Sequence, residues 1–212
     1  IYGMFTMAFF PNHAGIVMIS VYIIGIIVAI LSGLLLKNTV FRGKPVPFVM
    51  ELPAYRIPSA KSVLLHMWEK AKDFIRKAFT IIFLASMVIW FLQSFDWSFN
   101  LVTDNTTSML ASIGKFIAPI FTPLGFADWR ASTALITGIT AKETVVSTFT
   151  VLTGASTNAE LTTMLHMVFP STLTAFSFLV FTVLYMPCIA AFAASRRELG
   201  SMKSALGTAL FQ

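Results

Sequence analysis

Long stretches without a charged residue are the feature that most constrains how this chain can fold. Residues 14–36 and 79–95 contain no Asp, Glu, Lys or Arg, and a helix of about 20 apolar residues crosses the roughly 30 Å hydrocarbon core of a bilayer. Only 11% of all residues are charged, which is less than half of the roughly 25% usual in soluble domains. The sequence therefore predicts an all-α fold, that of a polytopic helical membrane protein.

We expect about five transmembrane helices. Two of them should be broken, because proline lacks an N–H donor and clashes with the preceding helical turn. Pro119 and Pro123 interrupt the third predicted span, and Pro187 interrupts the last. Residues 204–212 are interpreted as the start of a truncated last helix, so we expect the chain to be part of a longer protein. The predicted spans are residues 14–36, 79–95, 107–127, 131–152 and 165–194.

The positive charges indicate how the spans are oriented. Lys and Arg gather in residues 37–77 and 196–203, whereas the connections at 96–104 and 153–160 contain acids and no Lys or Arg. Cytoplasmic loops of membrane proteins carry the excess of Lys and Arg. We therefore expect residues 37–77 and 196–203 to be cytoplasmic, and we interpret the net charge of +6 as this pattern and not as a nucleic-acid surface.

Residues 61–78 predict an amphipathic helix at the cytoplasmic surface. They follow a proline-rich stretch and place apolar side chains on one face and charged side chains on the other. Such a helix lies in the interface of an anionic leaflet. The alternative is that it couples a cytoplasmic domain to the spans.

Residues 133–148 are the first candidate for chemistry, because they place Lys142 and Glu143 inside a predicted span. Ionised groups there are costly and normally face a protein interior or a water-filled path. On a continuous helix the hydroxyl residues share one face, with Glu143 at its flank and Lys142 opposite. Hydroxyl and carboxylate oxygens suit a hard or borderline cation; alternatively, the hydroxyls pack helices together and each charge has a partner on another helix. The hydroxyl residues are Thr133, Thr137, Thr140, Thr144, Ser147 and Thr148.

The sequence Met186-Pro187-Cys188 is the second candidate. Pro187 frees the carbonyl group of Val183, and broken helices at membrane depth serve transporters as ion sites. A thiolate at Cys188 could ligate Fe(II), although a single cysteine in an apolar helix also fits as a small hydrophobic residue. His13 and His166, at the outer ends of predicted spans, are weaker candidates for metal ligands.

Catalytic motifs are missing from the sequence. It contains no G-x-x-x-x-G-K-[ST], no nucleophile elbow and no C-x-x-C or H-E-x-x-H pattern. The sequence therefore predicts a chain that is not an enzyme and that carries no cofactor of its own.

Three ordered segments resemble one family over essentially the whole chain. They are FVMELPAYRIP at residues 48–58, TGITAKETVVST at 137–148 and YMPCIAAFAASRRE at 185–198. Together they resemble the ferrous iron transport protein B (FeoB) family, in the C-terminal half of its membrane region. The resemblance implies a central FeoB-type segment at residues 1–60, the interfacial helix at 61–78 and a second Gate-type unit at 79–203.

The resemblance also implies a function, namely GTP-linked uptake of Fe²⁺ across a bacterial inner membrane. Cys188 would then be the Gate cysteine that lines the route, and Glu143 the intramembrane acid. Fe²⁺ would be the transported substrate, while GTP and Mg²⁺ would bind only in an N-terminal GTPase domain of the same polypeptide. The implied partners are the lipid bilayer, that GTPase domain, small Feo accessory proteins and further copies of the chain, with no nucleic acid.

Two other functions remain open on the sequence. Gate-type units also resemble those of nucleoside carriers, so the hydroxyl residues could bind a polar organic solute. The chain could instead be a membrane docking module for a G-protein domain, without a conduction path of its own.

Overall fold

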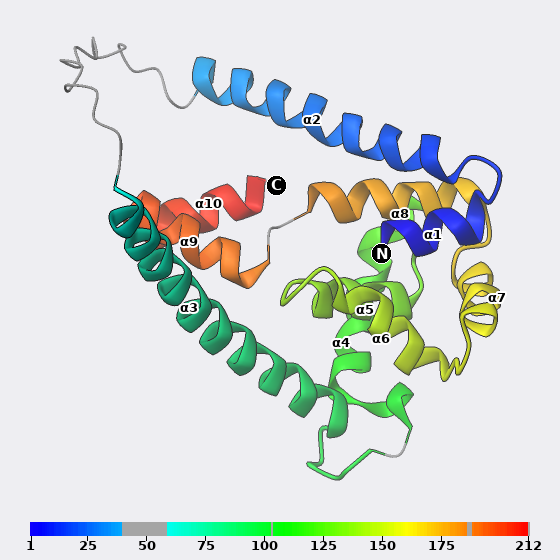
Figure 1. The fold of residues 1–212 in the computed structure, drawn as a ribbon. Helices are drawn as coiled ribbons and strands as arrows, with labels where there is room; N and C mark the ends of the chain where they lie inside the picture. The colour runs from blue at the N-terminus through cyan, green and yellow to red at the C-terminus, as the bar shows by residue number, and fades with distance from the viewer. Residues whose placement is uncertain (40–58, 103, 186–187, 212) are drawn as a thin grey trace. The chain divides into compact units, whose positions relative to one another are not determined.

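The computed structural model describes residues 1–39, 59–102, 104–185 and 188–211, and in these ranges the chain is helical (Figure 1). The only pairing of extended backbone among them is an isolated bridge between Phe95 and Leu101. The predicted all-α fold is confirmed. The α-helices are α1 (Tyr2–Phe9), α2 (Ala14–Thr39), α3 (Ala60–Ser94), α4 (Met109–Ile117), α5 (Trp129–Gly138), α6 (Thr144–Thr153), α7 (Asn158–Val168), α8 (Thr172–Leu184), α9 (Ile189–Leu199) and α10 (Met202–Phe211), and the 3₁₀ helices are η1 (Asn105–Thr107) and η2 (Ala118–Leu124).

Contacts divide the chain into two compact units. The first comprises Ile1–Gly25 and Ile81–Gln212, and the second comprises Ile26–Thr80. The proline-rich stretch, with the motif at 48–58, falls outside the described residues. In the second unit, the N-terminal part of α3 exposes both charged and large apolar side chains, among them Leu64 and Trp68.

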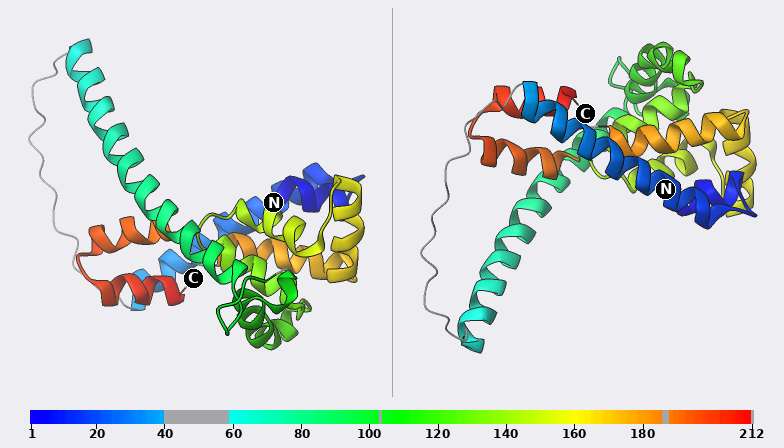
Figure 2. Two further views of the ribbon diagram at one scale, coloured as in Figure 1. Left: turned by 90° about the horizontal axis from the view of Figure 1, so that it is seen from below. Right: turned by 90° about the horizontal axis from the view of Figure 1, so that it is seen from above.

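Helix α3 runs without interruption from Ala60 to Ser94 (Figure 2). The sequence predicts two separate elements here, an interfacial helix at 61–78 and a span at 79–95. The structure joins them, because no glycine or proline lies within Ala60–Ser94 to end the helix. The interfacial position of residues 61–78 stays a prediction.

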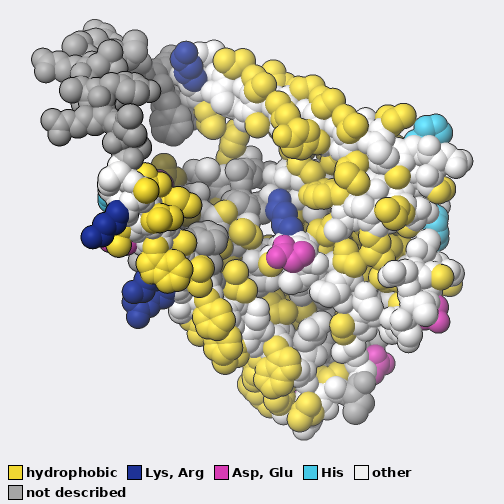
Figure 3. All heavy atoms as spheres, viewed as in Figure 1, with side chains coloured by type: hydrophobic (Ala, Val, Ile, Leu, Met, Phe, Trp, Pro, Cys, Tyr) yellow, Lys and Arg dark blue, Asp and Glu magenta, His cyan; other side chains and the backbone are white. Residues whose placement is uncertain are grey.

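Apolar side chains cover the surface of α2, as a lipid-facing helix requires (Figure 3). Among the described residues, two stretches are long and apolar enough to cross a membrane, Ala14–Thr39 and Thr172–Leu199. A third is added if Met109–Leu124 and Trp129–Gly138, bent by 102°, form one span. A membrane-embedded helical chain is thus supported, while five crossings stay a prediction.

The third predicted span breaks where its prolines stand. Helix α4 ends at Ile117, and the chain continues as the 3₁₀ helix η2, which contains Pro119 and Pro123. Gly125 then takes a left-handed conformation with φ of 85°, which glycine adopts without a steric penalty. The predicted break at Pro119 and Pro123 is confirmed.

The acidic loop after α3 uses its carboxylates to hold its own backbone. Asp96 accepts hydrogen bonds from the backbone N–H groups of Ser98 and Asn100, at 2.8 and 2.9 Å. Asp104 caps η1 by accepting from the N–H of Thr106 at 3.0 Å, and the hydrogen bonds from Thr106 lower the pKa of the Asp104 carboxyl group.

A cluster of phenylalanine rings forms the core of the first unit. Phe5 of α1 is fully buried, and its ring centroid lies 5.3 Å from that of Phe178 and 5.4 Å from that of Phe169. Phe149 of α6 and Phe9 of α1 complete the contacts of Phe5, at 6.0 and 6.1 Å. Helix α1 is therefore built into the same core as α6 and α8.

We expect Phe5→Ala to lower the thermal midpoint of the full-length parent protein in detergent by several degrees. The substitution leaves a cavity among four aromatic rings, and Phe→Ala changes in cores cost about 3–5 kcal/mol. The matched control is Phe116→Ala, because Phe116 is 84% exposed. Equal midpoints for the two variants would contradict the position of α1 in the core.

Candidate functional site

The candidate site is built around a break between α5 and α6. Helix α5 ends at Gly138 and α6 begins at Thr144, so the prediction of one continuous helix over residues 131–152 is wrong. The carbonyl group of Thr137 accepts from the hydroxyls of Thr140 and Thr144, at 2.5 and 3.0 Å. Threonine hydroxyls that bind backbone carbonyls compete with helical hydrogen bonding, and this competition accompanies the end of α5.

The hydroxyl residues gather around this break and not along one helical face. The hydroxyl oxygens of Thr137 and Thr148 lie 2.7 Å apart and join α5 to α6, although the two residues are 11 positions apart. Both side chains are buried. The packing of two short helices thus brings Thr137, Thr140, Thr144, Ser147 and Thr148 to the break, whereas the hydroxyl of Thr133 donates to the carbonyl of Trp129 at the start of α5.

Four of these residues line a pocket of about 180 Å³ in the first unit. Thr140, Thr144 and Ser147 each donate their single hydroxyl proton to a backbone carbonyl, of α5, of the break and of α6 respectively. Because a hydroxyl has one donor and two acceptor lone pairs, these oxygens can only accept from a ligand in the pocket. The lining is completed by α3, and the residues are Ser86, Ile89, Trp90, Gln93, Thr140, Thr144, Ser147, Thr148 and Val151.

The contribution of α3 to this pocket was not predicted. Ser86 and Gln93 are polar residues in the apolar part of α3, and they lie seven positions apart, which places them on one face of a helix. That spacing is a signal in the sequence which could have found them.

A second break lies opposite the first, where α8 ends at Leu184 and α9 begins at Ile189. The ammonium group of Lys142 donates to the carbonyl oxygens of Thr182, Val183 and Tyr185, at 2.9, 3.4 and 3.4 Å. The same ammonium lies 4.7 Å from the centroid of the Tyr185 ring. The carbonyl of Val183, which the sequence predicts to be freed, is thus bound by a lysine from the other break.

Backbone contact also joins the two breaks. The N–H of Ile189 donates to the carbonyl oxygen of Ile139 at 2.9 Å. Cys188, directly before Ile189, is half-buried and lies within electrostatic range of Lys142. The structure therefore brings Cys188 and Lys142 to one junction, whereas Met186 and Pro187 lie outside the described residues.

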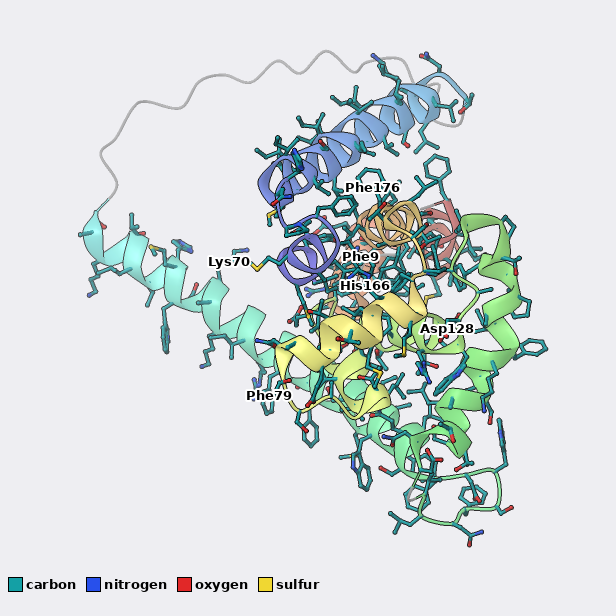
Figure 4. The ribbon with its side chains drawn as sticks, turned by 90° about the vertical axis from the view of Figure 1, so that its right-hand side faces the viewer. Phe9, Lys70, Phe79, Asp128, His166 and Phe176 are labelled. Carbon is teal, nitrogen blue, oxygen red and sulfur yellow. The ribbon has the colours of Figure 1, made fainter. Side chains whose placement is uncertain are left out.

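Glu143 and the two histidines occupy other positions. Glu143 is exposed at the start of α6. His13 is exposed between α1 and α2. His166 lies beside Phe9, with ring centroids 4.3 Å apart, and its Nε2 is 3.2 Å from the carbonyl oxygen of Ala8 (Figure 4).

None of these three residues lines the pocket between α3 and α6. In the described part of the chain, no three His, Cys, Asp or Glu residues come together as a metal site would require. A ligand cation at the breaks would therefore meet mainly hydroxyl and carbonyl oxygens, with the single thiol of Cys188 nearby.

Two family models match the chain. One is described as the C terminus of ferrous iron transport protein B and matches residues 18–70, and the other, the Gate model, is described as nucleoside recognition and matches residues 75–202. The chain belongs to the FeoB family. The predicted resemblance is confirmed, and the bounds 1–60, 61–78 and 79–203 stay predictions.

The relatives of this FeoB chain carry the same name. The Fe(2+) transporter FeoB of Methanocaldococcus jannaschii is 37% identical over 207 residues, which is 94% of this chain and 30% of that protein. The Fe(2+) transporter FeoB of Staphylococcus aureus strain COL is 38% identical over 203 residues, or 96% of this chain and 30% of the relative. The chain thus spans 30% of the length of these relatives. No solved structure matches it.

One further relative is described as a fusion of two proteins. A protein of Porphyromonas gingivalis described as a fusion of Fe(2+) transport protein A and Fe(2+) transporter FeoB is 34% identical over 259 residues, covering 100% of this chain and 30% of the fusion.

We expect Gly138→Ala to destabilise the junction of this FeoB chain. A Cβ atom at Gly138 would lie 2.5 Å from Cγ2 of Val145 and 2.6 Å from the hydroxyl oxygen of Tyr185. Overpacking of this kind costs about 1–3 kcal/mol, which a thermal melt of the full-length protein would detect. Gly207→Ala is the control, because a Cβ there meets nothing within 4 Å; loss of stability in the control alone would contradict the close packing at Gly138.

Proposed function

We propose that this chain is the C-terminal part of the membrane domain of a ferrous iron uptake transporter. Membership of the FeoB family and the names of the relatives support Fe²⁺ as the substrate. The long apolar helices support a position within a membrane. The chain would act as a permease portion and not as an enzyme.

The pocket between α3 and α6 is the observation that best supports a conduction path at this place. Its hydroxyl oxygens present lone pairs, since their protons are given to the backbone. Neutral oxygen ligands replace part of the hydration of Fe²⁺ without holding the ion tightly, and conduction requires binding that is weak enough to allow release. In this proposal the metal passes the hydroxyls of Thr140, Thr144 and Ser147.

Cys188 and Glu143 have separate parts in the same proposal. Cys188 stands at the start of α9, beside the junction of the two breaks, and offers a transient soft ligand for Fe²⁺. Glu143 is exposed at the start of α6, and its carboxylate attracts the cation towards the break. Pro187 and Met186 are included in the proposed path because they directly precede Cys188 in the sequence.

The surroundings of the chain follow from the family. We place it in the bacterial inner membrane, with residues 37–77 and 196–203 cytoplasmic according to their Lys and Arg content. A GTPase domain of the same polypeptide would bind GTP and Mg²⁺ and would act on the spans through residues 61–78. The fusion relative supports small Feo accessory proteins as partners. We also propose that copies of the protein associate as homo-oligomers.

Uptake of ⁵⁵Fe²⁺ by the full-length parent in proteoliposomes tests the path. We expect the double substitution Thr144→Val and Ser147→Ala to lower the uptake rate about tenfold, because loss of about 1.4 kcal/mol of stabilisation is a factor of ten. Thr163→Val is the control, since Thr163 lies exposed on α7, away from the pocket. Uptake at the parent rate by a correctly folded double variant would contradict the proposed path.

The same assay separates the other functions. The Gate model is described as nucleoside recognition, and Trp90 and Gln93 in the pocket have the chemistry to stack on a base and hydrogen-bond to it. Competition by nucleosides, in place of competition by Mn²⁺ or Co²⁺, would favour an organic solute. Iron uptake that survives both Glu143→Ala and Cys188→Ser would favour a docking module for a G-protein domain.

A further inference from the structure

The C-terminal end of α8 presents a group of carbonyl oxygens that the helix itself does not satisfy. The last carbonyls of any helix lack an intrahelical donor, and for Val183 the next-turn residue is Pro187, which has no N–H to give. In a low-dielectric surrounding, an unsatisfied backbone carbonyl costs several kcal/mol. These oxygens therefore need a donor or a cation from elsewhere.

Lys142 supplies that cation. Its ammonium group has three N–H donors and no acceptor, and it meets three carbonyl oxygens, those of Thr182, Val183 and Tyr185. The ring of Tyr185 faces the same ammonium at 4.7 Å. A positive charge is also favoured at this position by the negative end of the α8 dipole.

The position of Lys142 makes this contact a link between distant segments. Lys142 lies in the break between α5 and α6, some 40 residues from its partners on α8. No carboxylate takes part in the three contacts, so the site is held by neutral oxygens. Sites made of neutral carbonyl oxygens are typical of monovalent cations, as in the filters of potassium channels.

We propose that the carbonyl oxygens of Thr182, Val183 and Tyr185 form a monovalent-cation site, and that the ammonium group of Lys142 is its tethered occupant. The ammonium group of Lys142 thereby holds the break between α5 and α6 against the break that follows α8. A free K⁺ ion, which resembles an ammonium ion in size and charge, takes the site when the lysine is removed or withdraws. This inference concerns the junction itself and holds whatever solute the protein carries.

The test uses the full-length parent in detergent, with thermal unfolding measured in chloride salts of K⁺, Li⁺ and choline at equal ionic strength. We expect Lys142→Met to lower the midpoint by several degrees in choline chloride. K⁺ should restore at least half of that loss, and Li⁺ less, because the site is sized for an ammonium ion. The parent should show no such difference between salts beyond what its other domains contribute.

Lys115→Met is the matched control. Lys115 also donates to a backbone carbonyl, that of Thr106 at 2.8 Å, but it is exposed and makes this one contact to a carbonyl oxygen. Its loss should shift the midpoint little and should create no response to K⁺. A response to K⁺ that is equal in the parent, Lys115→Met and Lys142→Met would place the ion elsewhere and overturn the proposal.

Two further results test the proposal, one for the case that Lys142→Met does not fold and one for the case that it responds to a divalent metal. If Lys142→Met does not fold, Lys142→Gln offers neutral donors to the same carbonyls and should fold with a lower midpoint and a smaller response to K⁺. A Gln variant as stable as the parent in choline chloride would show that no cation is needed and would overturn the proposal. Stabilisation of Lys142→Met by Mn²⁺ but not by K⁺ would also overturn it, because the site would then select a divalent metal.

Discussion

Backbone groups that a broken helix leaves without partners are the constraint on which this structure depends. A break in a helix leaves carbonyl and N–H groups without intrahelical partners, and each such group costs several kcal/mol if it is buried and stays unpaired. Two breaks of the first unit, at residues 139–143 and after Leu184, contact each other. The first break pairs several of its groups within its own segment, as the N–H groups of Thr140 and Thr144 show, whereas carbonyls at the end of α8 accept from Lys142.

The pairing of the breaks explains which side chains lie near them. Lys142 from the first break binds carbonyls of α8, and the N–H of Ile189 binds the carbonyl of Ile139 in return. The threonines of the first break satisfy carbonyls on their own side, as Thr140 and Thr144 do for Thr137. These contacts account for the positions of Lys142, Thr140 and Thr144 at the junction of the two breaks.

The sequence predicted the elements better than their interruptions. The long uncharged stretches predicted α2 and the helical class, and Pro119 and Pro123 marked the break after Ile117. The break at residues 139–143 contains no proline, and it is held by contacts with Thr148 and α8 that lie up to 43 residues away. Local pattern could not reveal it. For the same reason the expectation of one continuous helical face did not reveal that two short helices bring Thr137 and Thr148 together.

For the charged pair, the sequence left two interpretations. Lys142 has partners on α8, as the packing interpretation requires, while Glu143 is exposed, and its part in binding a cation stays a prediction. Ser86 and Gln93 share one face of α3 by their spacing in the sequence, but the packing that places α6 against that face cannot be read from the spacing.

The middle and the C-terminal end of α8 differ in the strength of their contacts. Its middle is fixed by Phe178 and Leu179, both fully buried in the aromatic core with Phe5. Its C-terminal end is fixed by a few hydrogen bonds from Lys142, two of them at 3.4 Å, and a net hydrogen bond is worth only about 1 kcal/mol, or somewhat more when charged. Core packing of large aromatic side chains is worth several times that per residue. The phenylalanine core therefore contributes more to the position of α8 than the polar junction at its C-terminal end does.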